Sequence, residues 1–303
     1  MRILITGSTG FVGQNWIAYG KSKCPNWQYN LLNRNDLYKT NIADYFVGID
    51  IVLHFAGKAH DLKNTTAPEE YYQVNTEVTK KLFDAFLVSE TKVFIKLSSV
   101  KAVADQVEGE LVEEHIPDPV THYGKSKFLA EEYILSKSIP KGKRVFILRS
   151  CMIHGPGNKG NLNLLYKLVS KGIPWPLGSF DNKRSFCSIE NLCFVIKELI
   201  EREDISSGIY NIADNEPVST NQLIQLISIA QNKKPIIYNI PKRVIYLIAK
   251  LGAVLHLPLN TERLRKLTET YLVSNQKLLS ILGKELPISS REGLIKTFQS
   301  FNS

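Results

Sequence analysis

The feature that most constrains the fold lies at the start of the chain, where a short apolar run meets three spaced glycines. Residues 2–6, RILIT, have the composition of a β-strand, and GSTGFVG at 7–13 leads into a helical stretch reaching about Tyr19. Such glycines permit a tight turn and let the backbone approach a pyrophosphate at the positive end of the helix. The unit predicts a dinucleotide site, with a structural turn as the alternative. Its expected contacts are Gly7, Gly10, Phe11, Val12 and Gly13.

The end of the next predicted strand indicates which dinucleotide is bound. The run YNLLN ends at Asn33, where an NAD site usually carries an Asp or Glu that holds the ribose 2′-hydroxyl. Asn33 and Arg34 stand there instead, and an arginine can pair with the 2′-phosphate of NADP. We expect NAD or NADP as the cofactor, with Arg34 favouring NADP. The alternative is that Arg34 is an ordinary surface residue.

A third apolar run, IDIVLHFAG at 49–57, ends in small residues where the backbone could pass beneath the cofactor. This run adds Phe55, Ala56 and Gly57 to the expected cofactor contacts. The segment before it is short, which places Asn41 and Ile42 of KTNIAD near the adenine. Loop packing would explain these two residues as well.

The pentapeptide YGKSK occurs twice, at 19–23 and at 123–127. The first copy falls at the far end of the first helix, about two turns past the glycines, and is expected to be a solvated helix end. The second follows a predicted strand, VFIKL, that runs into Ser98 and Ser99. A helix predicted from His122 to about Ser138 places Tyr123 and Lys127 on one face. A hydroxyl at the carboxyl end of a strand, facing such a helix, makes an acid–base site.

The motifs GSTGFVG, HFAG, VNTEVT around Asn75, KLSSV, YGKSK and GPGNKGNL together resemble one family. It is the extended short-chain dehydrogenase/reductase group, within the NAD-dependent epimerase/dehydratase family. The resemblance implies a Rossmann α/β fold, a doubly wound parallel sheet with a smaller α+β substrate-binding lobe. It implies a cofactor domain at 1–155, to which 185–215 returns, and a nucleotide-sugar lobe at 156–184 and 216–303. It also implies that Ser99, Tyr123 and Lys127 are catalytic, and that Asn75, Tyr123 and Lys127 touch the cofactor.

The implied chemistry accounts for these residue types. A free phenol has a pKa of about 10, so it is a poor base at neutral pH unless a neighbouring positive charge favours the phenolate. Lys127 would supply that charge, and Tyr123 could then exchange a proton with a sugar hydroxyl as hydride moves. Ser99 would hold the same sugar oxygen.

The resemblance also implies a nucleoside diphosphate-sugar, most simply a UDP-sugar, as the substrate. It assigns Arg184 of NKRSFCSIEN to the nucleotide or its diphosphate, with Asn161 and either Arg263 or Arg265 as further contacts. For each arginine, a surface salt bridge is the alternative. The chain differs from the usual family pattern at two positions, with His154 in place of Tyr before GPG and Glu190 in place of Asp. The residues that contact the sugar are therefore not assigned.

Three functions remain after this comparison. A UDP-sugar 4-epimerase is the main expectation, and an NADPH-dependent 4-keto reductase of a UDP-4-keto-6-deoxy sugar is the alternative. Dehydration is excluded because Val100 and Lys101 follow Ser99 where dehydratases carry two acids. A non-catalytic member that senses redox state or binds RNA is the third, but the chain keeps Ser99, Tyr123 and Lys127 and lacks a basic, aromatic stripe.

Composition indicates which partners, metals and cellular locations to expect. The net charge of +9 is spread along 303 residues, so we expect no nucleic-acid partner. The four cysteines lack metal-ligand spacing, which predicts no metal and reduced thiols in a cytoplasmic enzyme. The longest apolar run, 244–257, is shorter than the roughly 20 residues that span a bilayer, and it predicts a buried helix, with a membrane-surface helix as the alternative. The family resemblance suggests a homodimer.

Overall fold

In the computed structural model, the residues described are 1–39, 41–59, 66–158, 160–255 and 259–302. Six parallel strands form the central sheet, in the order β2-β1-β3-β4-β6-β9. The order reverses between β1 and β3, as in a doubly wound dinucleotide-binding sheet. The strands are β1 (Arg2–Thr6), β2 (Gln28–Leu32), β3 (Ile51–His54), β4 (Val93–Ser99), β6 (Arg144–Ser150) and β9 (Gly208–Ile212). The expected Rossmann sheet is therefore confirmed.

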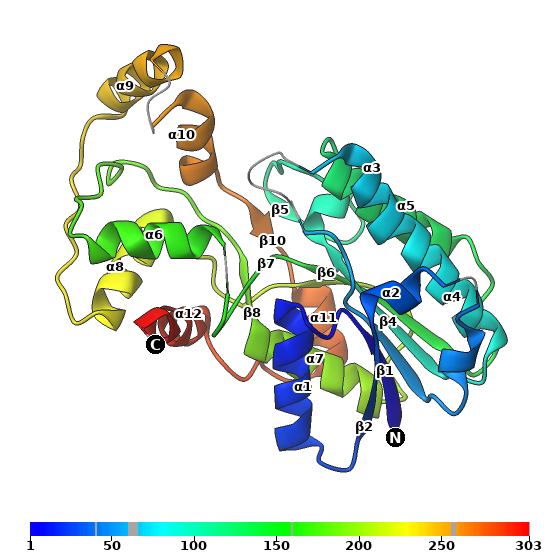
Figure 1. The fold of residues 1–303 in the computed structure, drawn as a ribbon. Helices are drawn as coiled ribbons and strands as arrows, with labels where there is room; N and C mark the ends of the chain where they lie inside the picture. The colour runs from blue at the N-terminus through cyan, green and yellow to red at the C-terminus, as the bar shows by residue number, and fades with distance from the viewer. Residues whose placement is uncertain (40, 60–65, 159, 256–258, 303) are drawn as a thin grey trace.

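Helices cover both faces of this sheet, because its strands are apolar on both sides (Figure 1). One face carries a core shared with α1 (Phe11–Lys23), α7 (Ile189–Glu201) and α11 (Gln276–Leu282). The other face packs against α4 (Val78–Val88) and α5 (His122–Leu135). Short elements link them: α2 (Arg34–Leu37), η1 (Ala43–Phe46), α3 (Pro68–Tyr71), the π-helix η2 (Tyr72–Glu77) and η3 (Val100–Ala102).

A second apolar core belongs to a smaller, mostly helical lobe (Figure 1). Its helices are α6 (Asn161–Ser170), α8 (Thr220–Ala230), α9 (Lys242–Val254), α10 (Thr261–Thr268) and α12 (Ser290–Gln299), with η4 (Ser300–Asn302) at the end. Two small parallel pairs join the lobe to the main sheet region. They are β7 (Met152–His154) with β8 (Phe186–Ser188), and β5 (Glu110–Leu111) with β10 (Leu272–Val273).

The prediction of a buried helix at 244–257 is wrong. Its last two residues lie outside the described part of the chain, and the helix itself, α9, buries Ile245 and Ala249 but leaves Leu247 and Leu251 exposed. The reason is its place at the outer end of the small lobe, where one side of the helix meets the second core and the other side meets solvent (Figure 1). Within the described residues, no helix is long and apolar enough to cross a bilayer.

The expectation of a solvated end for the first YGKSK is confirmed for Lys21, Ser22 and Lys23, which are exposed, and is wrong for Tyr19. Tyr19 is partly buried, packs against the first core and stacks on Trp16 with ring centroids 6.0 Å apart. Burial raises the pKa of the Tyr19 phenol to about 12. The helix continues past Tyr19 to Lys23 and packs against α7, so the tyrosine faces the protein interior and not the solvent.

Candidate active site

The glycine turn after β1 is too tightly packed to hold side chains. Gly7 has a φ of +72°, and a Cβ there would lie 2.6 Å from the backbone nitrogen of Ala56. A Cβ on Gly13 would lie 2.3 Å from the carbonyl oxygen of Gly7. The Gly10 amide donates to that same oxygen at 3.0 Å, which closes the turn.

This turn opens into the N-terminus of α1, which no side chain caps. Gly10 is the N-cap residue in extended conformation, and the first helical turn carries no acidic residue. Unpaired amides and the helix dipole favour an anion at such an end. The GPG loop lies beside it, since a Cβ on Gly155 would lie 3.4 Å from Cζ of Phe11. The glycine turn and this helix end therefore fit the diphosphate of a dinucleotide.

The end of β2 lies at the same edge as the glycine turn, because Thr6 of β1 is in register with Leu32 of β2. Asn33 follows as the N-cap of α2, and Arg34 is exposed at its first position. Among the described residues Arg34 forms no ion pair. Its guanidinium is therefore available at the place where a ribose 2′-substituent would lie in this fold.

The two residues expected near the adenine have contacts within the protein. Asn41 Oδ1 accepts a hydrogen bond of 3.0 Å from the Ala43 amide, and Ile42 is buried among core residues. A contact of Asn41 and Ile42 with the adenine therefore stays a prediction.

The segment after β3 lies close to the helix of the second YGKSK. The Ala56 amide donates to Thr6 Oγ1 at 3.2 Å, and Phe55, which precedes it, packs against the first core. A Cβ on Gly57 would lie 3.0 Å from both Asn75 Oδ1 and Lys127 Nζ. The absence of a side chain at Gly57 therefore keeps the space before these two polar groups open.

Asn75 is fully buried in the π-helix η2 and bridges two segments. Its Oδ1 accepts from the Lys58 amide at 2.8 Å, and its Nδ2 donates to the Lys58 carbonyl at 3.2 Å and to Ser126 Oγ at 2.9 Å. π-helical turns are frequent at functional sites. The bridge holds α5 against the loop that follows β3, which favours the positioning role expected for Asn75.

Ser99, Tyr123 and Lys127 meet at the carboxyl end of β4. The Ser99 side chain forms a hydrogen bond with Tyr123, and Lys127 Nζ donates to the Leu97 carbonyl at 3.3 Å. Burial raises the pKa of the Tyr123 phenol, and the bond with Ser99 opposes that rise. α5 is held at this place by its N-cap residue Thr121, whose side chain accepts from the Gly124 amide at 3.1 Å. The three residues expected to be catalytic are thus brought together.

A second lysine lies beneath Lys127. Lys96, on β4, is completely buried, and no acceptor among the described residues reaches its Nζ. Burial first, and then the Lys127 charge, hold the pKa of Lys96 well below its usual value. The two amines lie close enough for each to affect the pKa of the other. Burial also lowers the pKa of Lys127, to about 8.

The residues expected to bind substrate are spread over the small lobe. Arg184 is partly buried, donates to the Lys266 carbonyl at 3.1 Å and pairs with Glu269 at 3.5 Å. Asn161 is exposed at the start of α6, and Arg265 is exposed on α10. The structure therefore keeps Arg184 near the end of α10, and among the described residues no hydrogen bond or ion pair joins Asn161 or Arg265 to the Ser99 site.

Lys101 is a site residue that sequence reasoning did not select. Its Nζ donates to the Asp105 carbonyl at 2.7 Å and lies 4.1 Å from the centroid of the Tyr271 ring. Burial lowers the pKa of Lys101, and the charge of Arg184 acts in the same direction. Tyr271 lies between the two, since it forms a β-bridge with Arg184 and its ring lies under Lys101. The sequence feature that could have identified Lys101 is its position two residues after Ser99.

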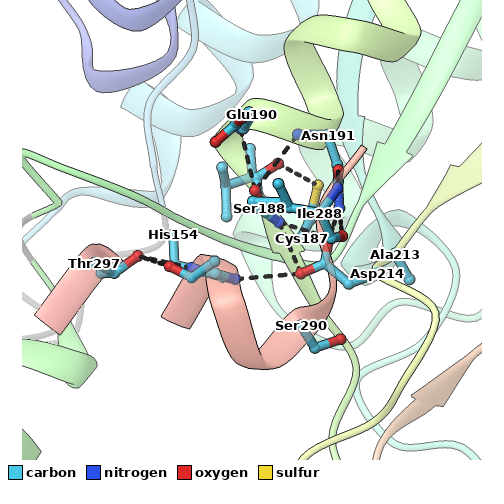
Figure 2. Close-up of polar contacts among 12 residues, drawn as sticks. His154, Cys187, Ser188, Glu190, Asn191, Ala213, Asp214, Ile288, Ser290 and Thr297 are labelled. Carbon is cyan, nitrogen blue, oxygen red and sulfur yellow. Dashed lines mark hydrogen bonds and ion pairs between the residues drawn. The ribbon is translucent and has the colours of Figure 1, made fainter. Parts of the chain in front are cut away.

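His154 is fully buried, and both nitrogens of its ring have partners within the protein. Figure 2 shows it between Thr297, at 2.9 Å from Nδ1, and Asp214, at 3.3 Å from Nε2. The Asp214 carboxylate also accepts from the Ser188 amide and from Asn191 Nδ2, the latter at 2.7 Å. This network ties β7, β8, α7 and α12 together. The second departure, Glu190, is half exposed and pairs with Lys296 at 2.8 Å.

Metal ligation has no candidate in the described ranges, where no group of three His, Cys, Asp or Glu side chains is placed to hold an ion. The four cysteines are free and buried.

Comparison with known proteins agrees with this geometry. UDP-glucose 4-epimerase of Vibrio cholerae is 31% identical over 99% of this chain and 95% of its own length. An Escherichia coli O157:H7 protein, N-acetyl-alpha-D-glucosaminyl-diphospho-ditrans,octacis-undecaprenol 4-epimerase, is 28% identical over 77% of this chain and 73% of its own. Among solved structures, MoeE5 in complex with UDP-glucose and NAD superposes with a TM-score of 0.77 at 19% identity, covering 100% of this chain and 99% of that one.

A family model described as the NAD dependent epimerase/dehydratase family matches residues 3–213. That range contains the glycine turn, Arg34 just after β2, and the cluster of Ser99, Tyr123 and Lys127. The expectation of an NAD(P)-dependent enzyme is thereby confirmed. The chain belongs to the NAD-dependent epimerase/dehydratase family.

Proposed function

We propose that the protein is a UDP-sugar 4-epimerase. The observation that carries the proposal is the meeting of Ser99, Tyr123 and Lys127 at the end of β4, beside a glycine turn that fits a dinucleotide. The name of the Vibrio cholerae relative, which matches this chain over almost its full length, supports the choice of reaction and of a UDP-sugar.

The proposed roles follow from the positions of the three side chains. A bound nicotinamide would supply reversible hydride transfer at C4 of the sugar, with hydride leaving one face and returning to the other. Tyr123 takes the proton of the C4 hydroxyl and gives it back, and Ser99 bonds the same oxygen. The bond with Ser99 opposes the effect of burial on the pKa of the Tyr123 phenol, and the Lys127 ammonium is assigned the role of favouring the phenolate.

Epimerisation requires the sugar to turn over while its nucleotide end stays bound. We assign this anchoring to Arg184, with Asn161 and Arg265 as further contacts to the diphosphate or the nucleotide. A guanidinium can bond two phosphate oxygens at once, whereas Arg184 now bonds a backbone carbonyl and Glu269. Substrate binding would exchange these contacts for stronger ones.

The assignments of the remaining cofactor contacts are part of the same proposal. Gly7, Gly10, Phe11, Val12 and Gly13 hold the diphosphate, Phe55, Ala56 and Gly57 lie beneath the nicotinamide half, and Asn75 positions α5. The division into a cofactor domain (1–155 with 185–215) and a nucleotide-sugar lobe (156–184 and 216–303) is proposed on the two separate apolar cores.

Arg34 favours a second candidate function, an NADPH-dependent 4-keto reductase. It is exposed just after β2 and forms no ion pair in the described part of the chain, and the strand-end position before it holds Asn33 where an NAD site usually carries an acid. Such a position suits a 2′-phosphate. A reductase consumes a reduced cofactor in each turnover, whereas an epimerase regenerates its own.

The exposed apolar face of α9 favours an alternative substrate, in which a lipid diphosphate carries the sugar in place of UDP. The name of the Escherichia coli relative specifies a sugar linked through diphosphate to undecaprenol, a membrane lipid. A sugar diphosphate carried on such a lipid presents the same C4 and the same phosphates to the site. We keep this lipid-linked sugar as the alternative to a UDP-sugar. Whichever carrier is used, we also propose a cytoplasmic location and a homodimer that packs through α5.

The first experiment identifies the nicotinamide that denaturation releases from the purified protein, by absorbance and mass. Stoichiometric NAD would support a recycled cofactor and therefore an epimerase. An empty protein that binds NADPH more tightly than NADH would support the reductase. A protein that binds neither dinucleotide would contradict both candidates.

A further inference from the structure

The exposed face of α9 is formed by Val244, Leu247, Ile248, Leu251 and Leu255, which we call the α9 stripe. Their spacing of three, four, seven and eleven residues places them on one side of the helix. Each side chain is between 41% and 64% exposed. A contiguous exposed apolar patch of this kind marks an interaction site.

The opposite side of the helix anchors it to the small lobe. Ile245 and Ala249 are buried in the second core, and Tyr246 packs edge-on against Phe180 at 5.8 Å between ring centroids. Lys242 lies over the same Phe180 ring, 5.6 Å from its centroid. The stripe is therefore held facing outward by packing on the other side of the helix.

Basic side chains line one flank of the stripe. Arg243 and Lys250 are exposed there, seven residues apart, and α10 packs beside α9. From 242 to 266 the sequence carries six Lys or Arg and a single acid, Glu262. An apolar stripe flanked by positive charge is complementary to a surface with anionic headgroups and a hydrocarbon interior.

A second copy of the chain fits this surface less well. Pairing two α9 helices about a two-fold axis would bring Arg243 and Lys250 of each copy near the same basic groups of the other, where like charges repel. The stripe also has five side chains, whereas a stable interface uses about 20–30 residues on each side. At 13 residues, α9 is too short to cross a bilayer, but it can lie in its surface.

We propose that α9 docks the small lobe on an anionic lipid bilayer, with the α9 stripe in the hydrocarbon boundary and the basic side chains at the headgroups. α10 joins this surface to the substrate side of the lobe, because Arg184 bonds the carbonyl of Lys266 at its end. The docked protein would present Arg184 one helix away from the membrane. The docking does not depend on which sugar reaction is catalysed.

Sedimentation of the whole protein with lipid vesicles tests the proposal. At low salt, the protein should co-sediment with vesicles of phosphatidylglycerol and phosphatidylethanolamine but not with phosphatidylcholine vesicles. The double variant Leu247→Ser, Leu251→Ser should reduce the bound fraction about tenfold or more, because it removes most of the apolar insertion. Arg243→Gln with Lys250→Gln should also reduce it, and added salt should mimic that loss.

A matched control removes two apolar side chains elsewhere. Val88→Ser with Ile116→Ser acts on residues 82% and 89% exposed, outside α9, and should leave vesicle binding unchanged. All variants should keep the unfolding temperature and the released cofactor of the parent, since every changed side chain is exposed. Activity on a soluble UDP-sugar should also persist, so loss of docking and loss of the proposed reaction are separate results.

Three outcomes would overturn the proposal. The parent protein could remain in the supernatant with anionic vesicles. The α9 double variant could bind as well as the Val88 and Ile116 control. The α9 double variant could instead convert a dimer into a monomer in sedimentation velocity while vesicle binding stays the same, which would assign the stripe to a second copy.

Discussion

Lys127 Nζ donates a 3.3 Å hydrogen bond to the carbonyl oxygen of Leu97, two residues before Ser99. The bond ties the helix that carries Tyr123 to the strand that carries Ser99. The Lys127 amine is therefore held against β4 before any cofactor or substrate arrives. The site is therefore ordered by its own side chains, which reduces the rearrangement needed for catalysis.

Replacing Tyr123 with Phe should abolish turnover while dinucleotide binding survives. The change removes one hydroxyl, and loss of a positioned acid–base group lowers the rate by about 10²–10⁴-fold. Steady-state rates with a UDP-sugar and titration with NADH measure the two effects. Tyr19→Phe in the other YGKSK is the matched control and should change neither. Normal turnover by the Tyr123 variant would remove the proposed site.

The activity should fall as the pH rises above about 8. Burial lowers the pKa of Lys127 to about 8, so the ammonium that favours the phenolate is present below this pH and lost above it. The pH profile of kcat/KM measures the basic limb. In Lys127→Arg the charge persists at all accessible pH, and this limb should move to higher pH. An unchanged limb in that variant would assign it to another group.

Lys96→Met should make the protein more stable at pH 7. Lys96 is buried and its pKa is held well below normal, so at pH 7 the unfolded chain binds a proton that the folded chain does not. Stability of the parent should therefore rise with pH towards about 10.4, the pKa of the unfolded lysine. The gain in the variant, about 1–3 kcal/mol at pH 7, should shrink by pH 10.

Chemical unfolding at pH 7 and pH 10 measures this difference. Lys92→Met, on an exposed lysine just before β4, is the control and should stay within about 0.5 kcal/mol of the parent. A loss of stability in the Lys96 variant at pH 7 would show that its amine is well paired in the folded protein.

Arg34→Ala should weaken NADPH far more than NADH. A guanidinium bound to a 2′-phosphate contributes a charge-assisted hydrogen bond, so the loss of affinity for NADPH should be about tenfold or more. Fluorescence titration with both dinucleotides measures the ratio. Arg291→Ala, at an exposed arginine on α12, should affect neither. Equal losses for the two dinucleotides in the Arg34 variant would remove the case for NADP.

Asp214→Ala should destabilise the fold by about 3 kcal/mol or more, because breaking a buried polar network leaves its other members unpaired. The carboxylate accepts from the Ser188 amide, Asn191 and His154 (Figure 2). Urea unfolding measures the change. Asp204→Ala removes an exposed carboxylate paired with Arg202 and should cost less than about 1 kcal/mol. Similar losses in both variants would contradict a structural role for the network.

The local sequence determined the elements that position the active site. The glycine turn, the strand before Ser99 and the helix with Tyr123 and Lys127 were predictable because each depends on short-range chemistry, that is, on glycine conformations, an apolar run and i, i+4 spacing. The family resemblance added the doubly wound parallel sheet, and the structure gave its strand order. The resemblance also explains why the second YGKSK, and not the first, lies beside Ser99.

Only the tertiary structure decided which side chains are covered. α9 and Tyr19 show this in opposite directions, since an apolar helix is left half exposed and a tyrosine near a polar helix end packs against the first core. Lys96 and His154 are buried by residues distant in sequence, including Lys127 and Thr297. Burial depends on how elements pack across the chain, and a periodic pattern identifies a helix without identifying what covers it.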